Sequence, residues 1–135
     1  MKVLFVCSGN AYRSPVAETL LKKIKPTIDA DSAGTTPSIP ISEAARRYLA
    51  RENALAYLKP SPESLDSKKL RGVDLIVAME QVHKEAVLKR CPECETKIVV
   101  WDIEDPYFLP YGRSEPIFNT IKAKVKQLAD TLPSE

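Results

Sequence analysis

Short apolar runs alternate along the chain with stretches in which apolar residues recur at helical spacing. The segments that predict strands are 2–7, 27–32, 73–79 and 97–101. The segments that predict helices are about 15–24, about 43–52, about 80–89, and a last one that begins at Ser114. Strands that alternate with helices in this way indicate an α/β fold with a parallel sheet.

Composition narrows the class of protein without identifying it. The 135 residues fit a single domain, 1–135, and 44% are hydrophobic, which is enough for one core. The net charge is only +2 and the basic residues are spread along the helices, so no nucleic-acid partner is expected. No apolar run approaches the roughly 18 residues of a membrane span, and Met1-Lys2 leads directly into a strand instead of a signal peptide. We therefore expect a cytoplasmic protein without a membrane partner, in which Cys7 stays reduced.

The first predicted strand ends at Cys7, where a polar loop begins that leads to Arg13 and a helix. Ser14 is a good capping residue and Pro15 fits the first helical position. Free backbone N–H groups and the helix dipole favour negative charge at such a helix start, and the same field favours the nucleophilic thiolate form of Cys7. The planar guanidinium of Arg13 is suited to two oxygens of a phosphate. This Cys-x5-Arg segment therefore predicts an oxyanion site with a reactive thiol.

Other loops that follow predicted strands should gather beside Cys7, because ligands in parallel sheets bind at the carboxyl ends of the strands. These loops are Ser32–Thr35, Met79-Glu80 and 102–112. Cleavage of a phosphate monoester by a thiolate also needs an acid that protonates the leaving oxygen. Asp105 is the best candidate, because Pro106 restrains its backbone to extended forms that would project the side chain.

Two motifs resemble those of the low-molecular-weight protein tyrosine phosphatase family. The first is Val6-Cys7-Ser8-Gly9-Asn10-Ala11-Tyr12-Arg13-Ser14-Pro15 with Ala17-Glu18 after it, and the second is Asp105-Pro106-Tyr107. The resemblance implies a flavodoxin-like three-layer sandwich, in which a four-stranded parallel sheet of order 2-1-3-4 carries helices on both faces. It also implies hydrolysis through a cysteinyl-phosphate on Cys7, with Arg13 binding phosphate, Asp105 as acid and then base, and no metal or cofactor. The implied partner is a phosphotyrosine-containing protein or a small aryl phosphate, and the implied assembly is a monomer or a weak homo-oligomer.

Residues around these motifs are candidates for contact with the substrate. They are Ser8, Gly9, Asn10, Ala11, Tyr12, Ser14 and Tyr107. Ser14 has two candidate roles, as a helix cap and as a donor to the Cys7 sulfur. Asn10 suits a left-handed turn, and in the family its counterpart bonds a serine after the second strand, here Ser32. Tyr12 and Tyr107 could line the mouth of a deep pocket and select aryl phosphates.

Some features of the chain differ from the family or leave alternatives open. Tyr12 stands where many members carry a second cysteine, and residues 36–41 lack the tryptophan that forms a pocket wall in many members. His83 lies on the helix after the third strand and is expected on the surface. Cys91 and Cys94 could form a disulfide, half of an intermolecular zinc site, or only a helix-ending loop.

Two other functions compete with the phosphatase. A thiol-dependent arsenate reductase of the same fold would also use Cys7, but its first shuttle cysteine should follow the third strand, where the chain reads Met79-Glu80-Gln81. A non-catalytic phosphate-binding module is the other alternative, and such modules usually lose the nucleophile or the arginine, both of which this chain retains.

Overall fold

The structure is a computed structural model that describes residues 1–109 and 113–133. Its helices and strands follow the order β1 (Lys2–Cys7), α1 (Arg13–Ile24), β2 (Asp29–Gly34), α2 (Glu43–Arg51), β3 (Leu75–Ala78), α3 (Gln81–Arg90), β4 (Ile98–Val100) and α4 (Ser114–Thr131). Short 3-10 turns lie between them, among them η1 (Leu55–Tyr57), η2 (Leu65–Ser67), η3 (Leu70–Gly72), η4 (Pro92–Lys97) and η5 (Pro106–Phe108). The predicted loop 102–112 thus ends in residues outside the described part of the chain.

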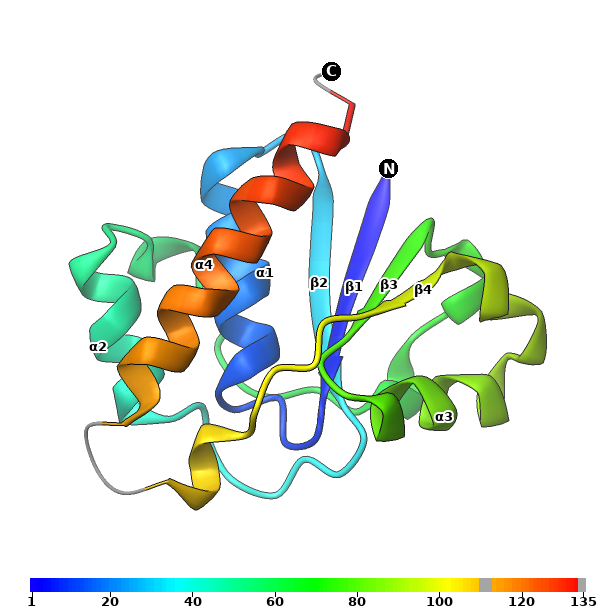
Figure 1. Cartoon of the computed structure of the whole chain (residues 1–135), viewed down its shortest axis with the longest axis horizontal. Helices are drawn as coiled ribbons and strands as arrows, with labels where there is room; N and C mark the ends of the chain where they lie inside the picture. Colours follow the sequence, from blue (N-terminus) through cyan, green and yellow to red (C-terminus); the bar gives the residue numbers. More distant parts are fainter. Residues whose placement is uncertain (110–112, 134–135) are drawn as a thin grey trace.

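The strands form one parallel sheet in the order β2-β1-β3-β4, which confirms the order implied by the family resemblance. β1 is a central strand because its run Val3–Val6 is fully buried on both faces. At its carboxyl end Cys7 pairs with Gly34 of β2, and one residue earlier Val6 pairs with Ala78 of β3. The segments that leave these strands therefore meet at one edge of the sheet, the lower edge in Figure 1.

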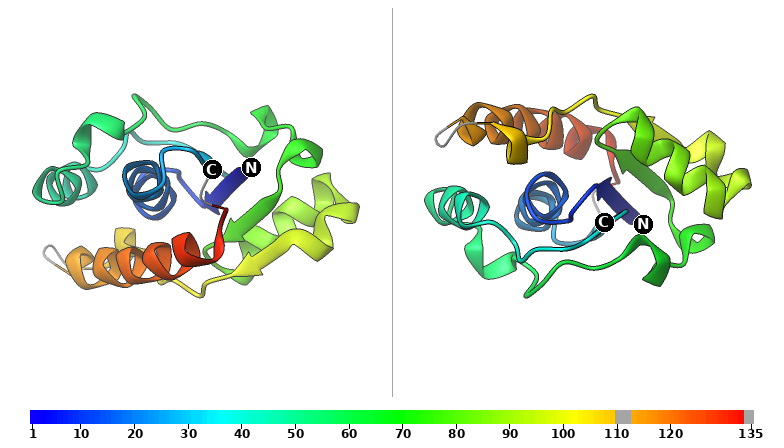
Figure 2. Two further views of the ribbon diagram at one scale, coloured as in Figure 1. Left: turned by 90° about the horizontal axis from the view of Figure 1, so that it is seen from above. Right: turned by 90° about the horizontal axis from the view of Figure 1, so that it is seen from below.

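Alternate residues of β1 enter two hydrophobic cores, because successive side chains of a strand point to opposite faces. Val3 and Phe5 pack with α1, α2 and α4 on one face, whereas Leu4 and Val6 pack with α3 and the 3-10 turns on the other. Figure 2 shows α1 and α4 on one side of the sheet and α3 on the other. The predicted three-layer arrangement is confirmed.

Several element boundaries differ from the predictions by one or two residues. β2 runs over Asp29–Gly34 instead of 27–32, and α1 begins at Arg13 instead of Pro15. Pairing with β1 from Lys2↔Asp29 to Cys7↔Gly34 decides the first boundary, because this polar strand has little hydrophobic pattern of its own. The residue that precedes α1 is Tyr12, so the prediction that Ser14 caps this helix is wrong. In the described part of the chain, no helix is both long enough and apolar enough to cross a membrane.

Candidate active site

The loop from Cys7 to Arg13 is held on its outer side by the segment that follows β2. Backbone N–H groups of Thr35 and Thr36 donate to the carbonyls of Cys7 (3.0 Å) and Ser8 (2.8 Å). Within the loop Asn10 has a φ of 53°, the left-handed conformation that the sequence predicted for it. A loop fixed in this way keeps its shape before any ligand arrives.

Cys7 is a free, buried cysteine, and its sulfur lies 2.8 Å from the hydroxyl oxygen of Ser14. That hydroxyl oxygen accepts a hydrogen bond from Nδ2 of Asn10 at 2.8 Å, which leaves the Ser14 hydrogen available for the sulfur. The same Nδ2 donates to the hydroxyl of Ser32 at 2.9 Å, as the resemblance implied. A hydroxyl that donates to sulfur favours a negatively charged thiolate.

The guanidinium of Arg13 is almost fully buried beside Cys7 and binds two segments from other strands. Its Nη1 donates to Oε1 of Glu80 at 2.5 Å and to the carbonyl of Ile103 at 2.7 Å, and its Nη2 lies 3.4 Å from Oδ2 of Asp105. Its Nε has no hydrogen-bond partner among the described residues. A buried donor without a partner is costly. Arg13 also lines the adjoining pocket, so an anion bound there would lie beside the guanidinium.

Asp105 is oriented by its own backbone turn. It precedes η5, and its Oδ1 accepts a hydrogen bond from the backbone N–H of Tyr107 at 3.0 Å. Its other oxygen, Oδ2, is the one nearest Arg13. The side chain is 21% exposed, so it can exchange a proton with a substrate or with water. The predicted nucleophile, phosphate ligand and acid thus lie around one pocket.

This pocket is lined by the loop residues 7–9 and 11–13 and by two walls. Thr36, Ser38 and Ile39 form one wall, in place of the tryptophan expected in many relatives, and Asp105 and Tyr107 form the other.

The rings of Tyr12 and Tyr107 meet edge to face at the pocket, with centroids 6.2 Å apart. Burial raises the pKa of Tyr12, and the negative charge of Asp105 adds to this effect, so its hydroxyl stays protonated at neutral pH.

Asn10 and Ser14 were predicted to contact substrate, but both are fully buried and neither is among the described residues that line the pocket.

The prediction that His83 lies on the surface is wrong. The residue is 1% exposed, its Nδ1 accepts the backbone N–H of Glu80 at 3.0 Å, and its Nε2 lies 2.9 Å from the hydroxyl of Ser8. Because Nδ1 is an acceptor, Nε2 carries the hydrogen and donates to Ser8. Burial lowers the pKa of His83 to about 4, and the charge of Arg13 adds to the effect. The spacing of Glu80 and His83 across the start of α3 is that of a capping pair, which was the signal available in the sequence.

Cys91 and Cys94 form a disulfide, which decides among the three options that the sequence left open. The disulfide lies between the end of α3 and the start of β4. Lys97, which precedes β4, donates to the carbonyls of Leu70 at 2.9 Å and Val73 at 2.5 Å, which precede β3. The disulfide therefore lies at the amino edge of the sheet, opposite to the edge that carries Cys7.

Comparison with known proteins agrees with this geometry. Residues 2–135 match the family model described as "Low molecular weight phosphotyrosine protein phosphatase". The chain is 30% identical to the low molecular weight protein-tyrosine-phosphatase Wzb of Salmonella typhi, over 99% of this chain and 95% of the relative. It is 27% identical to a protein-arginine-phosphatase of Geobacillus stearothermophilus, over 99% and 97% of the two chains. Its structure resembles that of the low molecular weight protein tyrosine phosphatase from T. tengcongensis, with a TM-score of 0.86, 30% identity, and 98% and 99% of the two chains covered. The chain belongs to the low molecular weight phosphotyrosine protein phosphatase family.

Proposed function

We propose that the protein hydrolyses phosphotyrosine in proteins, or small aryl phosphates, with Cys7 as nucleophile, Arg13 as phosphate ligand and Asp105 as general acid and base. The observation that carries the proposal is the arrangement around Arg13. Arg13, whose Nε has no hydrogen-bond partner among the described residues, lines a pocket that Cys7 and Asp105 also line. A phosphate bound there would meet a donor, a nucleophile and an acid at once.

In the first step the Cys7 thiolate attacks phosphorus and the bond between phosphorus and the phenolic oxygen breaks. Arg13 and the backbone N–H groups of the loop stabilise the charge on the equatorial oxygens. Asp105, protonated at the start, gives its proton to the leaving phenol oxygen. The products are a cysteinyl-phosphate on Cys7 and a free phenol.

In the second step a water molecule attacks phosphorus, and Asp105, now ionised, takes a proton from it. The bond between sulfur and phosphorus breaks, inorganic phosphate leaves, and the thiolate of Cys7 returns. The hydroxyl of Ser14, 2.8 Å from the sulfur, stabilises the charge that develops on it. Both steps balance with water as the only co-reactant.

The aromatic pair at the pocket supports a preference for aryl esters. Tyr12 and Tyr107 present ring edges and faces where the leaving group of a bound ester would lie. Because one relative is named a protein-arginine-phosphatase, phosphoarginine is the competing substrate that the assay must include.

The arsenate reductase alternative lacks support in the position of the other thiols. A shuttle cysteine must reach the sulfur of Cys7, whereas Cys91 and Cys94 are bonded to one another at the opposite edge of the sheet. We also propose that the protein acts in the cytoplasm, where Cys7 would stay reduced. The Cys91–Cys94 disulfide would resist reduction there because both cysteines are buried. A monomer or a weak homo-oligomer would leave the pocket open to a protein substrate.

The proposal is tested by turnover of phosphotyrosine, phosphoserine and phosphoarginine peptides and of substituted phenyl phosphates. Cys7→Ser should abolish turnover and retain phosphate binding. Asp105→Asn should slow hydrolysis most, by about 100-fold or more, for esters with poor leaving groups. Unchanged turnover in Cys7→Ser, or an equal loss for all leaving groups in Asp105→Asn, would contradict these roles.

A further inference from the structure

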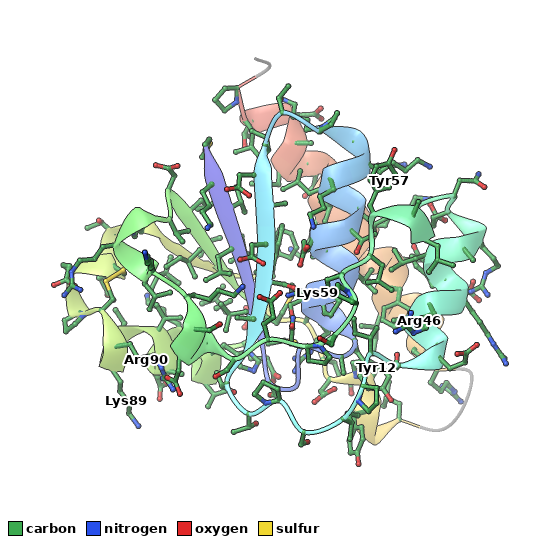
Figure 3. The ribbon with its side chains drawn as sticks, turned by 180° about the vertical axis from the view of Figure 1, so that it is seen from behind. Tyr12, Arg46, Tyr57, Lys59, Lys89 and Arg90 are labelled. Carbon is green, nitrogen blue, oxygen red and sulfur yellow. A yellow bond between two sulfur atoms is a disulfide. The ribbon has the colours of Figure 1, made fainter. Side chains whose placement is uncertain are left out.

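Lys59 is a buried cation close to the active-site loop that the mechanism above does not use. It lies in the segment between η1 and η2, beside α1 on the side of the molecule seen in Figure 3, and its side chain is 5% exposed. A buried ammonium group persists only where charges and hydrogen bonds compensate for the loss of water. Its partners therefore indicate why the chain holds it there.

Three carboxylates from different elements compensate the charge. Glu63 lies 2.7 Å from Nζ, Glu18 of α1 3.6 Å and Asp31 of β2 3.8 Å. Nζ also donates to uncharged groups behind the active-site loop, namely the carbonyl (2.8 Å) and hydroxyl (3.1 Å) of Ser32 and Oδ1 of Asn10 (3.2 Å). These last contacts connect the cation to the loop that holds Cys7.

Lys59 and the backbone N–H of Glu63 together fix which way the amide of Asn10 points. Oδ1 of Asn10 accepts from Lys59 and from the backbone N–H of Glu63 at 2.8 Å, while Nδ2 donates to the hydroxyls of Ser14 and Ser32. A reversed amide would turn its NH₂ group toward two other donors. The hydroxyl of Ser32 cannot donate to Asn10 instead of accepting from it, because its hydrogen is directed to Oε1 of Glu18 at 2.5 Å.

We propose that Lys59 is a positioning residue that acts on Cys7 through Asn10 and Ser14. Lys59 donates to Asn10, Asn10 donates to Ser14, and Ser14 is left to donate to the sulfur. Every bond in this relay points its hydrogen toward Cys7, and the cation polarises the bonds that follow it. Its importance for catalysis rests on the proposed function, in which Cys7 is both nucleophile and leaving group.

A purely structural role of Lys59, as a counter-ion for carboxylates, would predict that any cation of the cluster matters equally. Lys68 provides the matched control. It bonds Asp31 at 2.8 Å and Glu63 at 2.7 Å, and its contacts within the described part of the chain do not include Asn10 or Ser32. Arg13, Glu80 and Asp105, the charged groups nearest the pocket, are unchanged in variants of either lysine.

The test is the rate of Cys7 alkylation by iodoacetate as a function of pH, in the full chain with the Cys91–Cys94 disulfide intact. We expect Lys59→Met to move the midpoint to higher pH by about one unit, and Lys68→Met to move it by less than about 0.3 unit. Lys59→Arg should restore part of the shift. In a Ser14→Ala background Lys59→Met should cause no further shift, because the relay is already broken.

Any of three results would overturn the proposal. The first is an equal midpoint in wild type and Lys59→Met, the second is an equal shift in the two lysine variants, and the third is a full additional shift on adding Lys59→Met to Ser14→Ala. Thermal unfolding identifies the temperature at which each variant is folded, and Lys59→Gln replaces Lys59→Met if the latter does not fold. Alkylation requires no turnover. A wild type that fails to hydrolyse phosphate esters but shows the expected midpoints would therefore refute the proposed function and leave this inference intact.

Discussion

His83 shows how burial changes what a single side chain does at this site. Its ring nitrogens bond the Glu80 backbone and the Ser8 hydroxyl, and its pKa is lowered to about 4 by burial and by Arg13. At neutral pH it is therefore an uncharged hydrogen-bond donor that holds Ser8. Because it is neutral, it places no second positive charge near Arg13. The residue that looked like a surface histidine in the sequence is part of the support of the loop.

The buried state of His83 predicts a loss of stability in mild acid. Between its ordinary pKa of about 6.5 and the folded value of about 4, the unfolded chain binds a proton that the folded chain does not. His83 therefore does not lower the free energy of unfolding above about pH 6.5. Below that pH the free energy of unfolding falls as pH decreases toward 4, by about 2.5 kcal/mol at pH 4.5. Urea denaturation at pH 7.5 and 4.5 should show this extra loss in wild type and not in His83→Gln. Identical losses in the two proteins would show that His83 is not held neutral.

At the scale of elements, the end of β2 packs directly against the backbone of the active-site loop. A Cβ atom on Gly34 would lie 2.6 Å from the carbonyl oxygen of Ser8, 2.8 Å from the nitrogen of Asn10 and 2.9 Å from the carbonyl carbon of Gly9. All three are backbone atoms that cannot swing away. Glycine is needed here because any side chain would prevent this close approach to the backbone of the loop.

Gly34→Ala should therefore displace the loop. We expect a loss of turnover of tenfold or more and a destabilisation of about 2–4 kcal/mol, since overpacking against backbone is poorly relieved. Gly72→Ala is the control, because nothing lies within 4 Å of a Cβ atom at that position. Kinetics and thermal unfolding of the two variants check the prediction. Normal turnover in Gly34→Ala would mean that the loop tolerates displacement.

Elements with a strong apolar pattern could be predicted from the sequence, and polar ones less well. The run Val3–Val6 identified β1, but β2 reads Asp-Ala-Asp-Ser-Ala-Gly at the edge of the sheet, and only pairing with β1 sets its position. The Cys7 loop and Asp105 could be found because the residues that determine their chemistry lie within short contiguous motifs. Lys59 could not, because burial of a polar side chain depends on contacts between segments distant in sequence. For His83 the sequence offered only the capping spacing with Glu80, which does not reveal its burial.

At the scale of the whole molecule, the two edges of the sheet hold different features. Cys7, Arg13 and Asp105 surround a pocket at the carboxyl edge, while Cys91 and Cys94 form a disulfide inside the core at the amino edge. The parallel topology produces this separation, because every strand ends at the same edge.

This separation predicts that the disulfide contributes to stability and not to chemistry. Cys91→Ala/Cys94→Ala should retain the turnover of aryl phosphates within about twofold, and should lower the free energy of unfolding by about 2 kcal/mol, the value for closing so short a loop. Turnover and denaturant unfolding measure the two effects. A loss of phosphatase activity in this variant would instead connect the pair to catalysis.

The proposed mechanism depends most directly on a covalent intermediate on Cys7. Asp105→Asn removes the base needed for the second step, whereas an ester with a good leaving group, such as para-nitrophenyl phosphate, needs little help from an acid in the first. Acid quenching of this variant during turnover, followed by peptide mapping by mass spectrometry, should find a phosphoryl group on Cys7. A phosphoryl group on another residue, or none on Cys7 while a burst of nitrophenol is released, would contradict the mechanism.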